Sequence, residues 1–164
     1  MLAAYIPGLT LLRDYDEGLL DAQPTAVPGW VLTLDEARQV IRQRTAEFPE
    51  DRLLGREQGT ALASVVATIY QGFDGHELYV STEEKAANLL YLVVKDHPLV
   101  DENKRSAAVL FVTFLARNGI LNRNDGTPRI TSLALAAATL MIAMSDPGEK
   151  RLRVTLLIRM LVDG

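Results

Sequence analysis

A short polar segment in the middle of the chain brings together side chains that could bind a phosphate and react with a hydroxyl group. Its sequence is Asp96-His97-Pro98-Leu99-Val100-Asp101-Glu102-Asn103, and Lys104-Arg105-Ser106 follow directly. A histidine can accept the proton of an attacking hydroxyl, and a carboxylate such as Asp101 can hold Mg²⁺ together with phosphate oxygens. With two cations beside them, these residues predict a nucleotide-binding site.

A helix is expected to begin where this segment ends, near Asn103. The first backbone N–H groups of a helix have no partner within it and carry a partial positive charge. Lys104 and Arg105 add full positive charges there, which costs roughly 0.3–1 kcal/mol each when they are exposed. A bound phosphate would explain both features. In the alternative, an ordinary loop, His97 caps the preceding helix, Asp101 caps the next one and the two cations are solvated.

Helices are predicted on both sides of this loop. Ser81-Thr82-Glu83-Glu84 is a capping box, and it opens a helix that runs to about Lys95. The helix after the loop is expected to reach Asn118 and to stop at Gly119, which suits the left-handed position after a helix end. Four further helices are predicted: from Thr33 to before Pro49, over 57–71, from Thr131 or Ser132 to about 144, and from about 147 to 162.

The predicted fold class is all-α, a helical bundle with at most one short β-hairpin. Segments 89–94, 107–115 and 133–144 are apolar almost all round, which predicts three helices that are buried on most sides. Gly72 and Gly75 precede a Glu-Leu-Tyr-Val sequence, which predicts a turn and a short extended piece.

The length of 164 residues fits one domain. Residues 1–32 contain several prolines and glycines between short apolar patches, so they are expected to form an irregular arm or connector. Residues 33–164 would then form the helical domain.

The composition is that of an ordinary globular protein, with 48% hydrophobic and 23% charged residues. There is no cysteine, which excludes disulfides, thiolate catalysis and cysteine-ligated metals. A formal net charge of -4 argues against broad affinity for nucleic acids. No signal-peptide pattern is evident, and the apolar runs are shorter than the roughly 20 residues that span a bilayer. We therefore expect a cytoplasmic protein whose partners include neither nucleic acid nor a membrane.

The pattern His97-Pro98-x-x-Asp101-x-Asn103-Lys104-Arg105 resembles the signature of the Fic/Doc family. The usual form of that signature is His-Pro-Phe-x-(Asp/Glu)-Gly-Asn-(Gly/Lys)-Arg. The family places this loop between two helices and has a short hairpin, the flap, upstream of it, so that the resemblance covers about residues 57–145. Its members transfer part of a nucleotide, most often AMP, to a hydroxyl group of a target protein.

The resemblance implies roles for individual residues of this chain. His97 would be the general base and Asp101 the Mg²⁺ ligand, while Asn103 and Arg105 would bind the phosphates, with Lys104 beside them. ATP and Mg²⁺ would be the cofactors. The flap would align a segment of the target by strand addition, a contact made mainly by the backbone. The flap residues are His76, Glu77, Leu78, Tyr79 and Val80.

Two positions bear on which group is transferred. Members that transfer AMP usually have glycine at the position of Lys104 and a second arginine at the position of Ala108. The Asp-x-Asn-Lys-Arg form is instead similar to Doc, the death-on-curing toxin, a protein kinase that acts on elongation factor Tu. A lysine there would occupy the place of the α-phosphate and favour an inverted nucleotide with its γ-phosphate at His97. We therefore expect phosphoryl transfer, with AMP transfer as the alternative.

Two departures from the family pattern weaken this expectation. Leu99 replaces the usual phenylalanine, an apolar anchor of the loop. Glu102, which belongs to the nucleotide site by position, replaces glycine or alanine. A carboxylate there would repel phosphate unless it points away or binds metal. A catalytically weakened domain that serves as a binding module is therefore a further alternative, and a plain helical domain with a fortuitous loop is the last.

The family often restrains itself with a helix that carries Ser/Thr-x-x-x-Glu. Ser145 and Glu149 have this spacing, but Pro147-Gly148 interrupts it and Lys150 follows, so we interpret the segment as a helix start. The partners implied by the resemblance are a target protein, with a translation factor as the first candidate, and an antitoxin-like inhibitor. A second copy of the chain, in a homodimer, is the remaining candidate.

Overall fold

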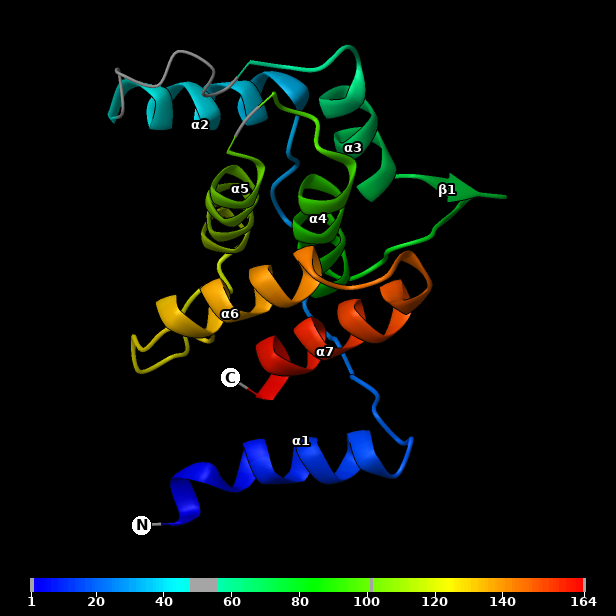
Figure 1. The fold of residues 1–164 in the computed structure, drawn as a ribbon, viewed down its shortest axis with the longest axis vertical. Helices are drawn as coiled ribbons and strands as arrows, with labels where there is room; N and C mark the ends of the chain where they lie inside the picture. Colours follow the sequence, from blue (N-terminus) through cyan, green and yellow to red (C-terminus); the bar gives the residue numbers. More distant parts are fainter. Residues whose placement is uncertain (1, 48–55, 101, 164) are drawn as a thin grey trace.

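The computed structural model describes residues 2–47, 56–100 and 102–163. Seven α-helices are present among them, and the only sheet consists of two short antiparallel strands (Figure 1). The predicted all-α class with a short hairpin is confirmed. The helices are α1 (Ile6–Asp16), α2 (Leu34–Glu47), α3 (Ala61–Ile69), α4 (Thr82–Asp96), α5 (Asn103–Arg117), α6 (Ser132–Ala143) and α7 (Lys150–Asp163), with 3-10 turns η1 (Leu2–Tyr5) and η2 (Pro147–Glu149) and strands β1 (Gly72–Phe73) and β2 (His76–Glu77).

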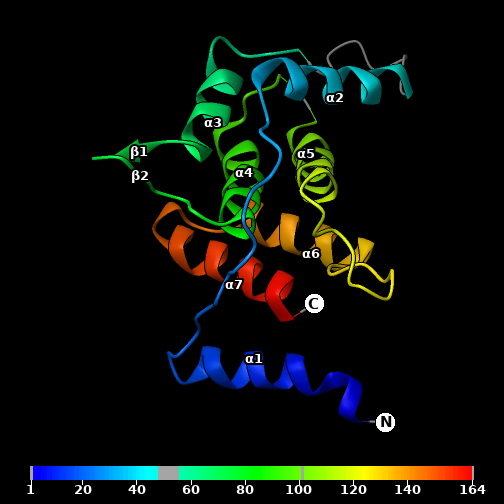
Figure 2. The same cartoon turned by 180° about the vertical axis from the view of Figure 1, so that it is seen from behind.

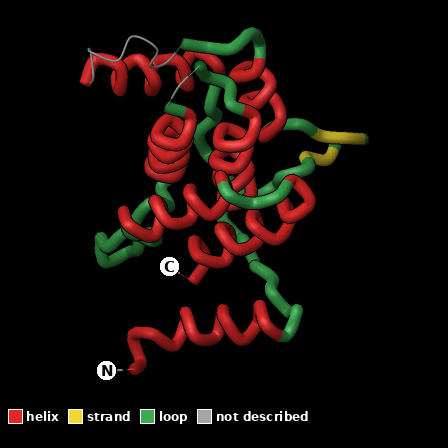
Figure 3. The backbone as a smooth tube through the Cα atoms, viewed as in Figure 1, coloured by secondary structure: helices red, strands yellow, loops and turns green. Residues whose placement is uncertain are grey.

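Helix α4 is the centre of the bundle. It packs against α3, α5, α6 and α7, and Figure 3 shows these helices gathered around it. Its side chains are buried along almost its whole length, as predicted for 89–94, and the segment 107–115 of α5 is largely buried too. Because α4 and α5 are the two helices that flank the polar loop, the best-packed part of the protein holds that loop.

Local sequence sets the ends of these two helices as predicted. The Ser81 hydroxyl accepts a hydrogen bond from the backbone N–H of Glu84 at 3.0 Å and donates one to Glu84 Oε1 at 3.0 Å, which confirms Ser81 as the cap of α4 and Glu84 as its side-chain partner. The helix ends before His97, because a residue that precedes proline disfavours the right-handed helical conformation. Helix α5 begins at Asn103 and is followed by Gly119, whose φ is +76°.

The expectation of an irregular segment over residues 1–32 is wrong for its first half. Residues 6–16 form α1, which lies at one end of the molecule beside α7 (Figure 2), and an Arg159 nitrogen lies 2.8 Å from an Asp14 carboxylate oxygen. Pro7 does not interrupt α1 because it occupies the first turn, where its missing N–H would have had no partner within the helix. The domain boundary at residue 33 stays a prediction.

Helix α6 is not buried on most sides, which corrects the prediction for 133–144. Leu133 is 82% exposed and Met144 is 83% exposed, while Leu135, Ala138 and Ile142 face the core. Alanine and leucine occur on both faces of α6, so apolar composition alone could not separate its inner face from its outer one. Among the described residues, no helix is long and apolar enough to cross a membrane.

Candidate functional site

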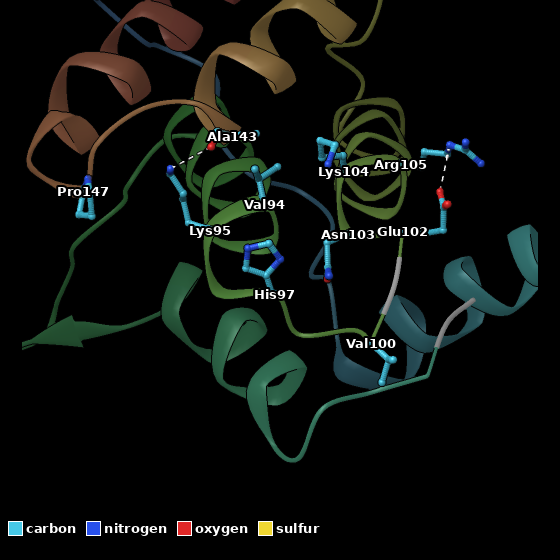
Figure 4. A pocket seen from close by; sticks show the side chains of 10 residues that line it. All are labelled: Val94, Lys95, His97, Val100, Glu102, Asn103, Lys104, Arg105, Ala143 and Pro147. Atoms are coloured by element: carbon cyan, nitrogen blue, oxygen red, sulfur yellow. Dashed lines mark hydrogen bonds and ion pairs between the residues drawn. The ribbon is translucent and has the colours of Figure 1, made fainter. Parts of the chain in front are cut away.

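The loop between α4 and α5 borders a cavity of about 680 Å³. Five of its lining residues, His97, Glu102, Asn103, Lys104 and Arg105, were predicted from the sequence to form the site. Figure 4 shows them around the cavity together with five that the sequence analysis did not identify. These five are Val94, Lys95, Val100, Ala143 and Pro147.

His97 lies where α4 ends, with a left-handed backbone conformation of φ 48° and ψ 60°. Its side chain is exposed and lines the cavity, where Figure 4 shows the ring near the centre of the labelled residues. The buried helix before it fixes the position from which the ring projects. An imidazole placed in this way can accept a proton from a hydroxyl group that enters the cavity. Its role as general base stays a prediction.

The segment before α3 holds the loop from the other side. Gln58 Nε2 donates hydrogen bonds to the carbonyl oxygens of Leu99 at 2.8 Å and His97 at 3.2 Å, and the Gln58 backbone N–H donates to Pro98 at 2.8 Å. Glu57 forms an isolated antiparallel bridge with Leu99. For this reason the helix that was predicted from residue 57 begins only at Ala61. Because these contacts join residues about forty positions apart, no local sequence signal pointed to Gln58.

Asn103 and Leu99 close the loop internally. The Asn103 side chain is buried, and its Oδ1 accepts from the Leu99 N–H while its Nδ2 donates to the Leu99 carbonyl, both at 2.9 Å. The Leu99 side chain is fully buried, so leucine serves as the apolar anchor at this position. Asn103 therefore shapes the loop in this structure, and its predicted contact with phosphate stays a prediction.

Replacing Asn103 by alanine is expected to lower the free energy of unfolding by about 1–3 kcal/mol. The reason is that the backbone N–H of Leu99 would lose its partner in a buried place, while the Leu99 carbonyl would keep only the bond from Gln58. Urea denaturation measures the change. Asn122→Ala is the matched control at an exposed position, with an expected change within about 0.5 kcal/mol. Equal stability of the two variants would show that the amide does not hold the loop.

The two cations occupy the first turn of α5, as predicted, but they differ in their surroundings. Arg105 Nε lies 3.0 Å from Glu102 Oε2. The Arg105 side chain is 61% exposed, whereas the Glu102 side chain is 19% exposed. In Figure 4 Arg105 lies beside Glu102, and Lys104 lies on the side of α5 that faces His97. The Glu102 carboxylate is therefore directed toward the Arg105 guanidinium. It neutralises part of the charge expected to attract phosphate.

Glu102 also has an unusual backbone conformation. Its φ is 62° and its ψ is 33°, the left-handed region that glycine adopts without strain and other residues rarely enter. Its side chain makes no capping hydrogen bond to the start of α5. The backbone N–H groups of that first turn and the side chains of Lys104 and Arg105 thus form the electropositive side of the cavity.

Lys95 is a third cation at the cavity that sequence reasoning missed. Its Nζ donates to the carbonyl oxygen of Ala143 at 3.3 Å and also to that of Ser145 (Figure 4). The Ala143 carbonyl belongs to the last residue of α6 and the Ser145 carbonyl follows the helix, where backbone acceptors lack helical partners. Lys95 thereby fixes the end of α6 against α4 and brings Ala143 to the cavity wall. The position of Lys95, two residues before His97, is the sequence feature that could have identified it as a residue of the site.

The residues predicted as a flap lie on a hairpin that projects from the bundle (Figure 3). In β1 and β2, Gly72 pairs with Glu77 and Phe73 pairs with His76. A Cβ at Gly72 would come within 2.6 Å of the His76 carbonyl oxygen, so this position requires glycine. The remaining flap residues, Leu78, Tyr79 and Val80, follow β2, and none of the residues 76–80 lines the cavity described above.

Asp101, the predicted Mg²⁺ ligand, lies outside the described residues. The described residues contain no group of three or more histidine, aspartate or glutamate side chains that could hold a metal ion. A protein site that uses one or two carboxylates together with phosphate oxygens is the arrangement that Mg²⁺ commonly adopts with nucleotides.

The segment with the Ser-x-x-x-Glu spacing is a helix start, as interpreted from the sequence. Pro147–Glu149 forms η2, and α7 begins at Lys150. Glu149 accepts a hydrogen bond from Arg153 of α7 at 2.5 Å. Its carboxylate is therefore bound within its own helical segment, not to Arg105.

A family model described as the Fic/DOC family matches residues 31–115, which is more than half of the chain. The matched part runs from just before α2 into the last turn of α5, so it includes the hairpin and the polar loop. No curated protein and no solved structure is similar enough to match the chain.

Proposed function

The chain belongs to the Fic/Doc family, and because this membership suggests nucleotide-dependent transferase activity, we propose that the protein transfers a phosphoryl group from ATP to a hydroxyl group of a target protein. One observation supports this proposal above all. His97 and the electropositive start of α5 border the same cavity, whose volume of about 680 Å³ is in the range of small-molecule sites. Lys104, at the position where glycine is usual in AMP-transferring members, favours phosphoryl transfer over nucleotidyl transfer.

In the proposed reaction the hydroxyl oxygen of the target attacks the γ-phosphorus of ATP. A new bond forms between these two atoms, and the bond from the γ-phosphorus to the oxygen that bridges to the β-phosphate breaks, so that ADP leaves. His97 accepts the hydroxyl proton. Lys104, Arg105 and the first N–H groups of α5 stabilise the negative charge of the phosphates. Asp101 is the residue proposed to hold Mg²⁺, which would screen phosphate charge.

AMP transfer is the closest alternative and uses the same residues. The target oxygen would then attack the α-phosphorus, and pyrophosphate would leave in place of ADP. The two reactions differ in which end of the nucleotide lies at His97.

A binding module without transferase activity is the second candidate function, and the ion pair between Glu102 and Arg105 favours it. The carboxylate engages the guanidinium that the family would use for phosphate. In this case the domain would hold a partner protein and perform no chemistry on it.

The partners follow from the family resemblance, and the location follows from the sequence pattern; both are part of the proposal. The target is a protein, with a translation factor as the first candidate, and a separate antitoxin-like protein would restrain activity. A second copy of the chain, in a homodimer, is the remaining candidate partner. The proposed location is the cytoplasm.

The experiment that tests the proposal uses purified protein, Mg²⁺ and a cell lysate, with ATP labelled on either the α- or the γ-phosphate. Label that passes to a protein band only from the γ-position would support phosphoryl transfer. Label from the α-position would establish nucleotidyl transfer and show that Lys104 does not set the orientation of ATP. If neither the α- nor the γ-label passes to a protein band, the result would favour the binding module.

A further inference from the structure

Lys85 is a lysine whose side chain is almost completely removed from water. It lies in the first turn of α4, and its side chain is 1% exposed. An ammonium group loses its hydration when it is buried, so it is tolerated only with close polar partners. The identity of these partners shows what the buried charge holds in place.

All of the described partners of Lys85 belong to the hairpin and its two ends. Its Nζ lies 3.2 Å from Glu77 Oε2 in β2, and it donates a hydrogen bond to the carbonyl oxygen of Tyr79, which follows β2. It also lies 5.2 Å from the centre of the Tyr70 ring, just before β1. A single ammonium therefore joins both ends of the hairpin to α4.

The hairpin has little packing of its own to fix its position. Its strands are two residues long, and their side chains, including that of Phe73, are exposed. A two-stranded hairpin of this kind is marginally stable by itself. Its position over the bundle thus depends strongly on the contacts at its base, which include the ion pair and the hydrogen bond of the buried ammonium.

We infer that Lys85 is a positioning residue that holds the hairpin in place relative to His97, so that a target segment paired with the hairpin presents its hydroxyl group to the cavity. This inference rests on the proposed function. Lys85 lies in the first turn of α4 and His97 lies directly after its last turn, so one buried helix joins the base of the hairpin to the proposed general base. Loss of the ammonium would change the alignment of the target but leave the nucleotide site intact.

The test compares Lys85→Met with Lys150→Met. Methionine keeps an unbranched apolar chain, and Lys150 is a matched control because its Nζ also lies near a tyrosine ring, 5.6 Å from that of Tyr91. We expect Lys85→Met to exchange the Leu78 amide hydrogen, which is bonded to Gln71 at 2.9 Å, at least about tenfold faster. The control should leave this rate unchanged. Unaltered exchange in Lys85→Met would overturn the inference.

Transfer kinetics then separate alignment of the target from folding. With the acceptor protein found by ATP labelling, Lys85→Met should raise the half-saturating concentration of acceptor at least about tenfold, with the affinity for ATP unchanged. Faster exchange with an unchanged requirement for acceptor would show that Lys85 anchors the hairpin but does not position a target, which overturns the inference. If no acceptor is labelled by the native protein, the proposed function fails and target alignment fails with it, while amide exchange still decides the anchoring.

A second variant guards against misfolding of Lys85→Met. Glu77→Gln removes one charge from the pair at a residue whose side chain is 48% exposed, so it leaves the core intact. We expect amide exchange of Leu78 and the requirement for acceptor to change in the same direction as in Lys85→Met, but less. An effect on ATP affinity in place of these two changes would contradict the inference.

Discussion

Replacing His97 by alanine is expected to lower the rate of label transfer from ATP by about 10²–10⁴-fold while leaving ATP bound. The imidazole is the proton acceptor at the cavity, and general base catalysis is worth about this much. The phosphate contacts are assigned to the start of α5, on the far side of the loop, so the affinity for ATP should change little. Label transfer measures the first quantity, and the ATP-dependent rise in melting temperature measures the second.

The backbone at His97 requires a second variant for this experiment. Its φ of 48° is left-handed, which asparagine tolerates better than alanine does. Alanine could therefore reduce transfer by moving the loop, whereas His97→Asn keeps the loop conformation and removes only the imidazole. Equal loss in both variants would assign the effect to the proton acceptor. Substantial activity in His97→Asn would show that the ring is not the base.

Local sequence was sufficient to predict the elements that carry the site. Ser81 caps α4 with Glu84 as its side-chain partner, Pro98 stops α4, and Gly119 follows the end of α5. Each of these signals acts within a few residues of its position, so it can be found without knowledge of the fold. For the same reason His97 was correctly placed after the end of α4 and the two cations in the first turn of α5, while their roles stay predictions.

The supports of the site come from distant parts of the chain, and local signals could not reveal them. Gln58 reaches the loop through a pairing of two irregular segments, and Lys95 reaches it through the end of α6. A lysine in the first turn of a helix is expected to be exposed, yet the hairpin and its two ends bury Lys85. Sequence can show which residues are able to react, but the contacts that hold them depend on how the segments pack.

Replacing Glu102 by glycine is expected to tighten ATP binding at least about tenfold, equivalent to roughly 1.4 kcal/mol. The change frees Arg105 from its 3.0 Å ion pair and removes a negative charge from the site of the phosphates. It also places glycine where φ is 62°, which relieves strain of about 1–2 kcal/mol. The added freedom of the unfolded chain offsets roughly 0.5–1 kcal/mol of this gain. The melting temperature without ATP should therefore move little.

Glu102→Gln separates the two effects of this substitution. Glutamine keeps the size of the side chain and the conformational preference of the backbone but carries no charge. Tighter ATP binding in both variants would show that the carboxylate itself restrains the site by holding Arg105. Tighter binding in Glu102→Gly alone would assign the effect to the left-handed backbone. Calorimetric titration with ATP and Mg²⁺ measures the dissociation constants.

The same two variants separate a restrained enzyme from a binding module. If Glu102 only weakens the site, the native protein transfers label slowly and both variants transfer it faster. At ATP concentrations below saturation, the rate should rise by about the same factor by which the dissociation constant for ATP falls. If the native protein is silent and Glu102→Gly gains both ATP binding and transfer that depends on His97, the remaining residues are a complete catalytic set that one carboxylate blocks. If ATP binding tightens without any transfer, the cavity holds a nucleotide but lacks a productive arrangement of base and target. Unchanged ATP binding in both variants would show that the ion pair with Glu102 does not compete with phosphate for Arg105.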